Sequence, residues 1–242
     1  MSLINVDRIR HLISAATLPH QHRGIEQDRI GTYQVTTLSR PGFAELVQLA
    51  RQNPSALIAV LPSTESTAER LVVCEALSEV SDPSTIPFWK NIVEHDADEE
   101  ALACAAIGLA RQRQVALLEE LEASRAHASS PRLLFHLGIA RLLLDDPRGV
   151  DYLVEMLRQE TVGDVSIASK SAVHGPTMRF IALSILQRIL PKGPGEEISQ
   201  WSDWWSGRRD RYQRINSSVL PTNQLAYVPP LSAFTGNEHR KK

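Results

Sequence analysis

Apolar residues recur along most of this chain with the spacing of amphipathic α-helices. Between positions 69 and 80 they fall at i, i+1, i+4, i+5 and i+8, which places them on one face of a helix. Further stripes predict helices at 2–16, a pair within 41–61, and helices at 83–95, 101–110, 115–121, 131–144, 150–157 and 177–190. The chain is therefore predicted to be all-α.

The predicted helices come in pairs that repeat along the chain. The pairs recur at spacings of 29, 35 and 42 residues when they are aligned on Ala76, Ala105, Ala140 and Ala182. Asp-Pro pairs at 82–83 and 146–147 mark turns, because proline suits the first turn of a helix and Asp82 can cap the helix that follows. Helix pairs with periods of about 30 to 45 residues are typical of α-solenoids.

The chain outside these pairs has a different character. Residues 17–40 are predicted to be a long loop after the first helix, and the β-like run at 32–38 is expected to be extended loop because no partner strand is apparent. After position 212 the prolines favour an extended tail. We therefore predict three parts: 1–40 as a helix and loop, 41–213 as helical repeats with a Trp-rich capping helix, and 214–242 as the tail.

The stretch ERLVVCEALSEVSDPSTIPFWKNIVEHDADEEALACAAIGLA, residues 69–110, resembles HEAT repeats. Residues 132–159 and 177–190 look like weaker copies, and RFIALSILQRILPKGPGEEISQWSDWWSGRRDRY resembles the closing segment of bacterial HEAT-repeat proteins. The likeness covers roughly residues 65 to 213 and implies a HEAT-like α-solenoid of antiparallel helix pairs. It implies little about function, because that family includes scaffolds, adaptors, lyases and glycosylases.

Composition and charge narrow the function classes. The chain has 242 residues with a formal net charge of −2, so nothing in its overall charge favours nucleic acid or an anionic membrane. Cys74 and Cys104 lie in apolar runs and are expected to be buried free thiols, which suits a reducing compartment. No signal-peptide or membrane-spanning pattern is apparent, so we expect a cytoplasmic protein.

The catalytic motifs that sequence inspection detects best are absent. There is no Gly-rich phosphate loop, G-x-S-x-G, H-E-x-x-H or C-x-x-C pair, so we expect no enzyme activity and no cofactor. His20 and His22 could gather around a metal with His11, Glu26 and Asp28, but imidazoles two apart in a loop seldom converge. We therefore interpret them as surface residues and expect no metal.

A tryptophan and arginine cluster lies near the end of the predicted repeats, and it has two interpretations. Aromatic faces beside guanidinium groups could stack on a nucleic acid strand. A terminal repeat must also cover the open end of its neighbour, and indoles at helical spacing do this well, so capping is the favoured interpretation. The cluster comprises Trp201, Trp204, Trp205, Arg208, Arg209, Arg211 and Arg214.

The sequence favours a non-enzymatic module, an adaptor or scaffold that binds a protein or peptide in the concave face of a solenoid. The predicted contacts are polar breaks in the central helices and the polar insertion 161–175, namely His136, Arg141, Asp164, Lys170, His174 and Arg179. The alternatives are a HEAT-like enzyme, either a DNA glycosylase or a pigment lyase, and a dedicated immunity or inhibitor protein. The sequence does not determine the oligomeric state.

Overall fold

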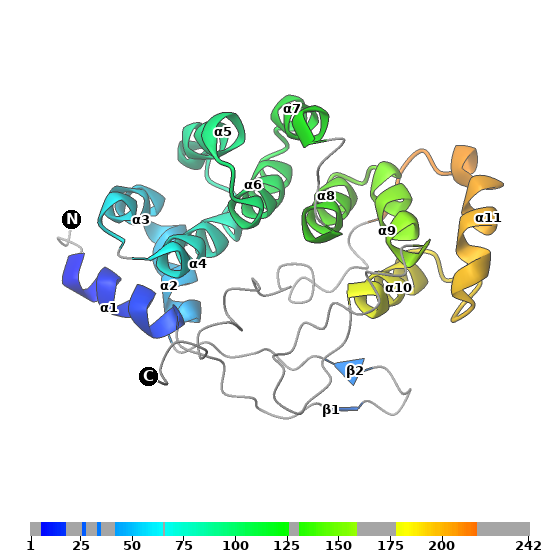
Figure 1. Cartoon of the computed structure of the whole chain (residues 1–242), viewed down its shortest axis with the longest axis horizontal. Coiled ribbons are helices and arrows are strands. Elements are labelled where there is room, and N and C mark those ends of the chain that lie inside the picture. Colours follow the sequence, from blue (N-terminus) through cyan, green and yellow to red (C-terminus); the bar gives the residue numbers. More distant parts are fainter. Residues whose placement is uncertain are drawn as a thin grey trace, which may run out of the picture. The chain divides into compact units, whose positions relative to one another are not determined.

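The computed structural model describes residues 6–17, 26–27, 33–34, 42–64, 66–125, 131–158 and 178–216 (Figure 1). These residues form 11 α-helices and a single pair of two-residue strands, so the all-α prediction is confirmed. The chain divides into two compact units. The described parts of the first unit lie between Val6 and Thr85, and those of the second between Ile86 and Asn216.

Four helices form the first unit: α1 (Val6–Thr17), α2 (Phe43–Gln52), α3 (Pro54–Val60) and α4 (Thr67–Ser78). Helices α1, α2 and α4 pack on one another, and α3 contacts all three. Apolar side chains from each helix are buried between them, including Ile9, Leu46, Leu57 and Leu71. Side-chain caps begin two of the helices: Asn53 accepts the N–H of Ala56 for α3 and Ser66 accepts the N–H of Glu69 for α4.

The strand pair corrects one expectation. Strands β1 (Glu26–Gln27) and β2 (Tyr33–Gln34) pair antiparallel, with Glu26 opposite Gln34. The run at 32–38 contains β2 and therefore has a partner, β1, a few residues earlier in the chain. The hydrophobic pattern missed this partner because Glu-Gln carries no apolar alternation.

Seven helices form the second unit: α5 (Ile86–His95), α6 (Glu99–Arg111), α7 (Val115–Arg125), α8 (Pro131–Leu143), α9 (Arg148–Arg158), α10 (Met178–Ile189) and α11 (Trp201–Ser206). Helices α5 and α7 pack on α6, α6 packs on α8, and α9 packs on α8, α10 and α11 (Figure 1). Short 3-10 turns, η4 (Ile198–Gln200) and η5 (Arg209–Arg211), flank α11. Each helix lies where the sequence predicted one.

Helix α6 packs against α5, α7 and α8, and its composition explains how it can contact three helices. All residues from Ala101 to Ala110 are buried, and five of these ten are alanine. Small side chains let α5, α7 and α8 approach closely. At Gly108 a Cβ atom would lie 2.5 Å from Cε2 of Trp89, a side chain of α5 that is itself fully buried.

The aspartates of the Asp-Pro turns accept backbone N–H groups as predicted, but neither proline lies within an α-helix. Asp82 Oδ1 accepts the backbone N–H of Ser84 at 2.8 Å, and this bond lowers the pKa of Asp82. The chain then forms a 3-10 turn, η2 (Pro83–Thr85), before α5. Asp146 Oδ1 accepts the N–H of Arg148, the first residue of α9, at 2.9 Å.

At the end of the second unit, two of the tryptophans pack inward. Trp201 and Trp205 are buried, and α11 packs against α9. Packing continues past position 213, where the extended tail was expected to begin. Ile215 is buried, and its N–H donates to the carbonyl of Asp145 at 2.9 Å.

Two further findings concern the cysteines and membranes. Cys74 and Cys104 are free and buried, as expected. Among the described residues, no helix is both long enough and apolar enough to span a bilayer.

Candidate functional site

A groove of about 690 Å³ opens in the second unit where the end of α9 and the start of α10 meet η4 and α11. Leu157, which is buried, and Ile198, which is half-buried, provide its apolar surface. The remaining lining residues are charged or carry hydroxyl groups: Arg158, Arg179, Glu197, Ser199, Ser202 and Asp203. Its volume lies within the range of about 300 to 1,000 Å³ usual for ligand sites.

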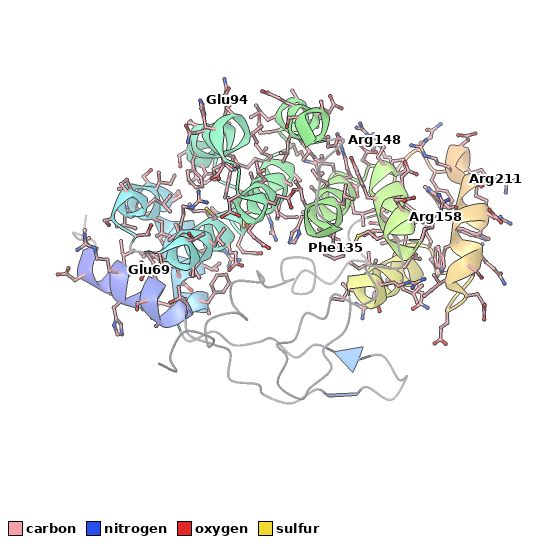
Figure 2. All side chains as sticks on the ribbon, viewed as in Figure 1. Glu69, Glu94, Phe135, Arg148, Arg158 and Arg211 are labelled. Carbon is pink, nitrogen blue, oxygen red and sulfur yellow. The ribbon has the colours of Figure 1, made fainter. Side chains whose placement is uncertain are left out.

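The charged residues of the groove are separated by sign. The α9 and α10 side carries the cations, Arg158 as the last residue of α9 and Arg179 as the second residue of α10. Arg158 extends from the end of α9 on the side nearest α11 (Figure 2). The η4 and α11 side carries the carboxylates of Glu197 and Asp203. We call these the cationic wall and the acidic wall.

Within the described residues, no ion pair crosses from the cationic wall to the acidic wall. Arg158 instead pairs with Glu155 one turn earlier on α9, at 3.3 Å, and its side chain is 64% exposed. The Nε atom of Arg179 is buried without a hydrogen-bond partner. Leaving a buried guanidinium donor unsatisfied costs about 1–3 kcal/mol.

Local sequence explains how the acidic wall is built. In the run WSDWW, Trp201 and Trp205 are four residues apart and share the buried face of α11. Trp201 Nε1 donates to the carbonyl of Gly195 at 3.0 Å. Ser202 and Asp203 lie outside that buried face of α11, and Asp203 is exposed in the groove.

Asp151 anchors α11 to α9. Trp205 Nε1 donates to Asp151 Oδ1 at 2.7 Å, and Arg209 forms a bidentate pair with the same carboxylate, with Nη2 2.7 Å from Oδ2. This carboxylate raises the pKa of Arg209 through its hydrogen bond and its charge. Arg208 lies over the ring of Trp204, 4.9 Å from the centroid. Trp205 and Arg209, both considered for nucleic acid stacking, thus hold α11 to α9 through Asp151.

The predicted contact residues fall into three groups. Arg179 lines the groove. Asp164, Lys170 and His174 lie outside the described residues, in the segment 159–177 that joins Arg158 to Met178. That segment is therefore attached at both ends beside the groove.

Arg141 and His136 are placed inside the second unit. His136 is 8% exposed, and its ring lies edge-on to Phe135 with centroids 5.6 Å apart. Arg141 is fully buried and so has no exposed surface for a partner. Its apolar surroundings in sequence made it look like a groove contact, but its charge is neutralised from within.

Arg141 lies in a network of carboxylates from neighbouring helices. Its Nε donates to Glu122 Oε1 at 2.7 Å, Nη2 donates to the other oxygen of Glu122, and Nη1 donates to Asp146 Oδ2 at 3.3 Å. Glu122 belongs to α7, Arg141 to α8, and Asp146 to the turn before α9. The network therefore joins two helices to the turn that precedes a third, and we call it the Arg141 network.

Three groups in or beside the Arg141 network have shifted pKa values: Asp146, Arg148 and Tyr152. Burial alone would raise the pKa of Asp146, but hydrogen bonds from the side chain and N–H of Arg148, with the charges of Arg148 and Arg141, lower it overall. The pKa of Arg148 is raised, chiefly by its hydrogen bond to Asp146. Burial, with the charge and hydrogen bond of Glu122, raises the pKa of Tyr152 to about 12. These three groups keep their ordinary charge at neutral pH. We therefore interpret the network as a set of ion pairs that stabilises the packing of α7 and α8.

Sequence reasoning found one member of the groove and missed the others. Arg158, Glu197, Ser199, Ser202 and Asp203 lie on three separate segments, and only packing brings them together. One sequence signal could have found part of the groove. The polar residues Ser202 and Asp203 lie between Trp201 and Trp205, and such a polar pair is not expected on the buried face of the helix.

Comparison of the chain with protein-family models, with curated proteins and with solved structures gives no match.

Proposed function

We propose that this protein is a non-enzymatic module that binds a protein or peptide, and that the groove between α9, α10, η4 and α11 is its recognition site. The observation that carries the proposal is the pair of oppositely charged walls with no ion pair between them among the described side chains. Charges held apart on packed helices are ready to pair with a ligand at little cost in reorganisation.

We also propose that the helix pairs of the second unit are HEAT-like repeats. Packing of α6 on α8, of α8 on α9 and of α9 on α10 supports this, as do the Asp-Pro turns. In this interpretation α11 is the capping helix, and the groove lies at the cap instead of at the central helices. Binding to the surface of stacked helices also suits an adaptor or scaffold.

Peptide selection tests the proposed function directly. The immobilised full chain is used to select from a library of displayed 12-residue peptides, and the affinity of enriched peptides is measured in solution by fluorescence anisotropy. We expect Arg179→Gln to weaken the selected peptides by about 10- to 100-fold, because a charge-assisted hydrogen bond contributes about 1.5–3 kcal/mol. Arg188→Gln is the matched control, because Arg188 lies on the same helix but not in the groove.

The control should bind within about two-fold of the unchanged chain, since a substitution away from the site has little effect on it. The proposed function fails if no peptide is enriched. It also fails if the enriched peptides bind equally well to the Arg179→Gln variant and to an Asp203→Asn variant, because the binding surface would then lie elsewhere.

A further inference from the structure

We infer that the groove recognises an extended peptide segment in which acidic and basic side chains alternate. This inference rests on the proposed function and gives the chemistry of the partner. It follows from three features of the groove: the sign of each wall, the geometry of an extended chain, and the apolar surface between the walls.

The first feature is the opposition of the walls. Arg158 and Arg179 come from α9 and α10, whereas Glu197 and Asp203 come from the turn before η4 and from α11. A purely acidic segment would find two partners on the cationic wall, but it would also face Glu197 and Asp203. A purely basic segment meets the reverse problem. Like charges brought together on binding reduce affinity, so neither kind of segment suits the groove as well as a mixed one.

The second feature is the geometry of an extended chain. Successive side chains of a β-strand point to opposite sides, and residues i and i+2 lie on one side about 7 Å apart. A segment lying along the groove would thus present its acidic side chains at i and i+2 to Arg158 and Arg179. The basic side chains at i+1 and i+3 would face Glu197 and Asp203. Strict alternation satisfies both walls at once, whereas blocks of like charge cannot.

The third feature is the set of apolar and hydroxyl side chains between the charged residues. Ile198, which is half-buried, offers apolar surface beside the buried Leu157, and the aliphatic stems of glutamate and lysine side chains can pack on it. The hydroxyl groups of Ser199 and Ser202 stand on the acidic wall and can donate to peptide carbonyls or accept from an ammonium group. Arg158 and Arg179 provide the cations with which the carboxylates of the segment can pair.

Peptides of identical length but different charge order provide the test. Four fluorescein-labelled octapeptides with blocked ends are titrated with the full chain at low salt. One alternates glutamate and lysine, one has four glutamates followed by four lysines, and the others are octaglutamate and octalysine. We expect the alternating peptide to bind at least five-fold more tightly than each of the other three. Its affinity should fall as salt rises from about 20 to 150 mM, because screening weakens exposed charge pairs.

Charge reversals assign the effect to the groove. Arg179→Glu and Asp203→Arg should each weaken the alternating peptide by at least five-fold. Glu196→Arg is the matched control for Asp203→Arg, since Glu196 is also an exposed carboxylate but does not line the groove. Asp203 is exposed, so its variant keeps the test valid even if a change at the half-buried Arg179 disturbs folding.

The outcomes separate this inference from the proposed function. Equal binding of the alternating and block peptides, tighter binding of octaglutamate or octalysine, or no binding of any octapeptide overturns the inference. Insensitivity to both charge reversals also overturns it. If library peptides meanwhile depend on Arg179 without alternating charge, the proposed function survives alone. If the library yields no groove-dependent peptide, both fail together.

Discussion

Replacing Arg141 with methionine tests whether the Arg141 network holds the second unit together. The substitution keeps much of the apolar volume and removes the guanidinium from a fully buried position. Glu122 then loses its bidentate partner while its side chain remains only 15% exposed. Asp146 loses less, because Arg148 still pairs with it at 2.6 Å. The cost of the variant is therefore dominated by one stranded carboxylate.

The expected magnitude follows from that stranded charge. Removing one partner of a buried ion pair costs about 3–5 kcal/mol. We expect about 3 kcal/mol, the lower end, because Glu122 keeps some exposure and its hydrogen bond with Tyr152. The double variant Arg141→Met, Glu122→Gln removes both charges. It should recover about 2 kcal/mol of the loss, within the range found for residues in direct contact.

Urea unfolding followed by tryptophan fluorescence measures these costs in the correct part of the molecule. All four tryptophans of the chain belong to the second unit: Trp89, Trp201, Trp204 and Trp205. With a denaturant slope of about 2 kcal/mol/M, a loss of about 3 kcal/mol moves the midpoint down by about 1.5 M. Arg158→Met is the control, because its pair with Glu155 is exposed and should contribute less than about 1 kcal/mol. A loss below about 1 kcal/mol for Arg141→Met, or simple additivity in the double variant, would refute the reasoning.

Two further predictions concern the contact between α8 and α9 and the titration of its turn. At Gly149 a Cβ would lie 2.6 Å from the carbonyl oxygen of Gly138, so Gly149→Ala should lower the free energy of unfolding in urea by about 2–3 kcal/mol. Gly207→Ala is the control, because its Cβ would lie 3.6 Å from the nearest atom and the change should cost less than about 1 kcal/mol. Similar losses for both variants would contradict the reasoning. The pKa of Asp146 is lowered in the folded state, so its carboxylate stabilises the fold above the unfolded pKa of about 4 and that contribution is lost as the pH falls further. The destabilisation by Asp146→Asn should therefore be greatest above about pH 5 and shrink towards about pH 2, and a difference that stays constant with pH would count against this role.

The helices could be predicted because their signal is local. The stripe at 69–80 corresponds to α4, Thr67–Ser78, and the apolar run at 131–144 corresponds to α8, Pro131–Leu143. Spacing on one helix is enough to identify a buried face. The two Asp-Pro turns could be predicted for the same reason, since aspartate caps the backbone N–H groups of residues that follow it closely in the sequence.

The role of Arg141 could not be predicted from the local sequence. Its sequence neighbours are apolar, so the pattern reveals a polar break but not what lies opposite. The partner Glu122 is 19 residues earlier, on another helix. Whether such a break faces solvent or a buried carboxylate depends on how α7 packs beside α8. The groove is a similar case, since its two walls come from α9, α10 and α11 and no single helix carries the pattern.

Helix α9 links the Arg141 network to the proposed recognition surface. The turn before it carries Asp146, which joins the Arg141 network, and its last residue is Arg158 on the cationic wall. In between, Asp151 accepts from both Trp205 and Arg209 and so fixes α11 beside α9. The ions along α9 are paired within the fold, including Arg158, which pairs with Glu155. The packing of α9 therefore connects the Arg141 network to the groove that we propose as the recognition site.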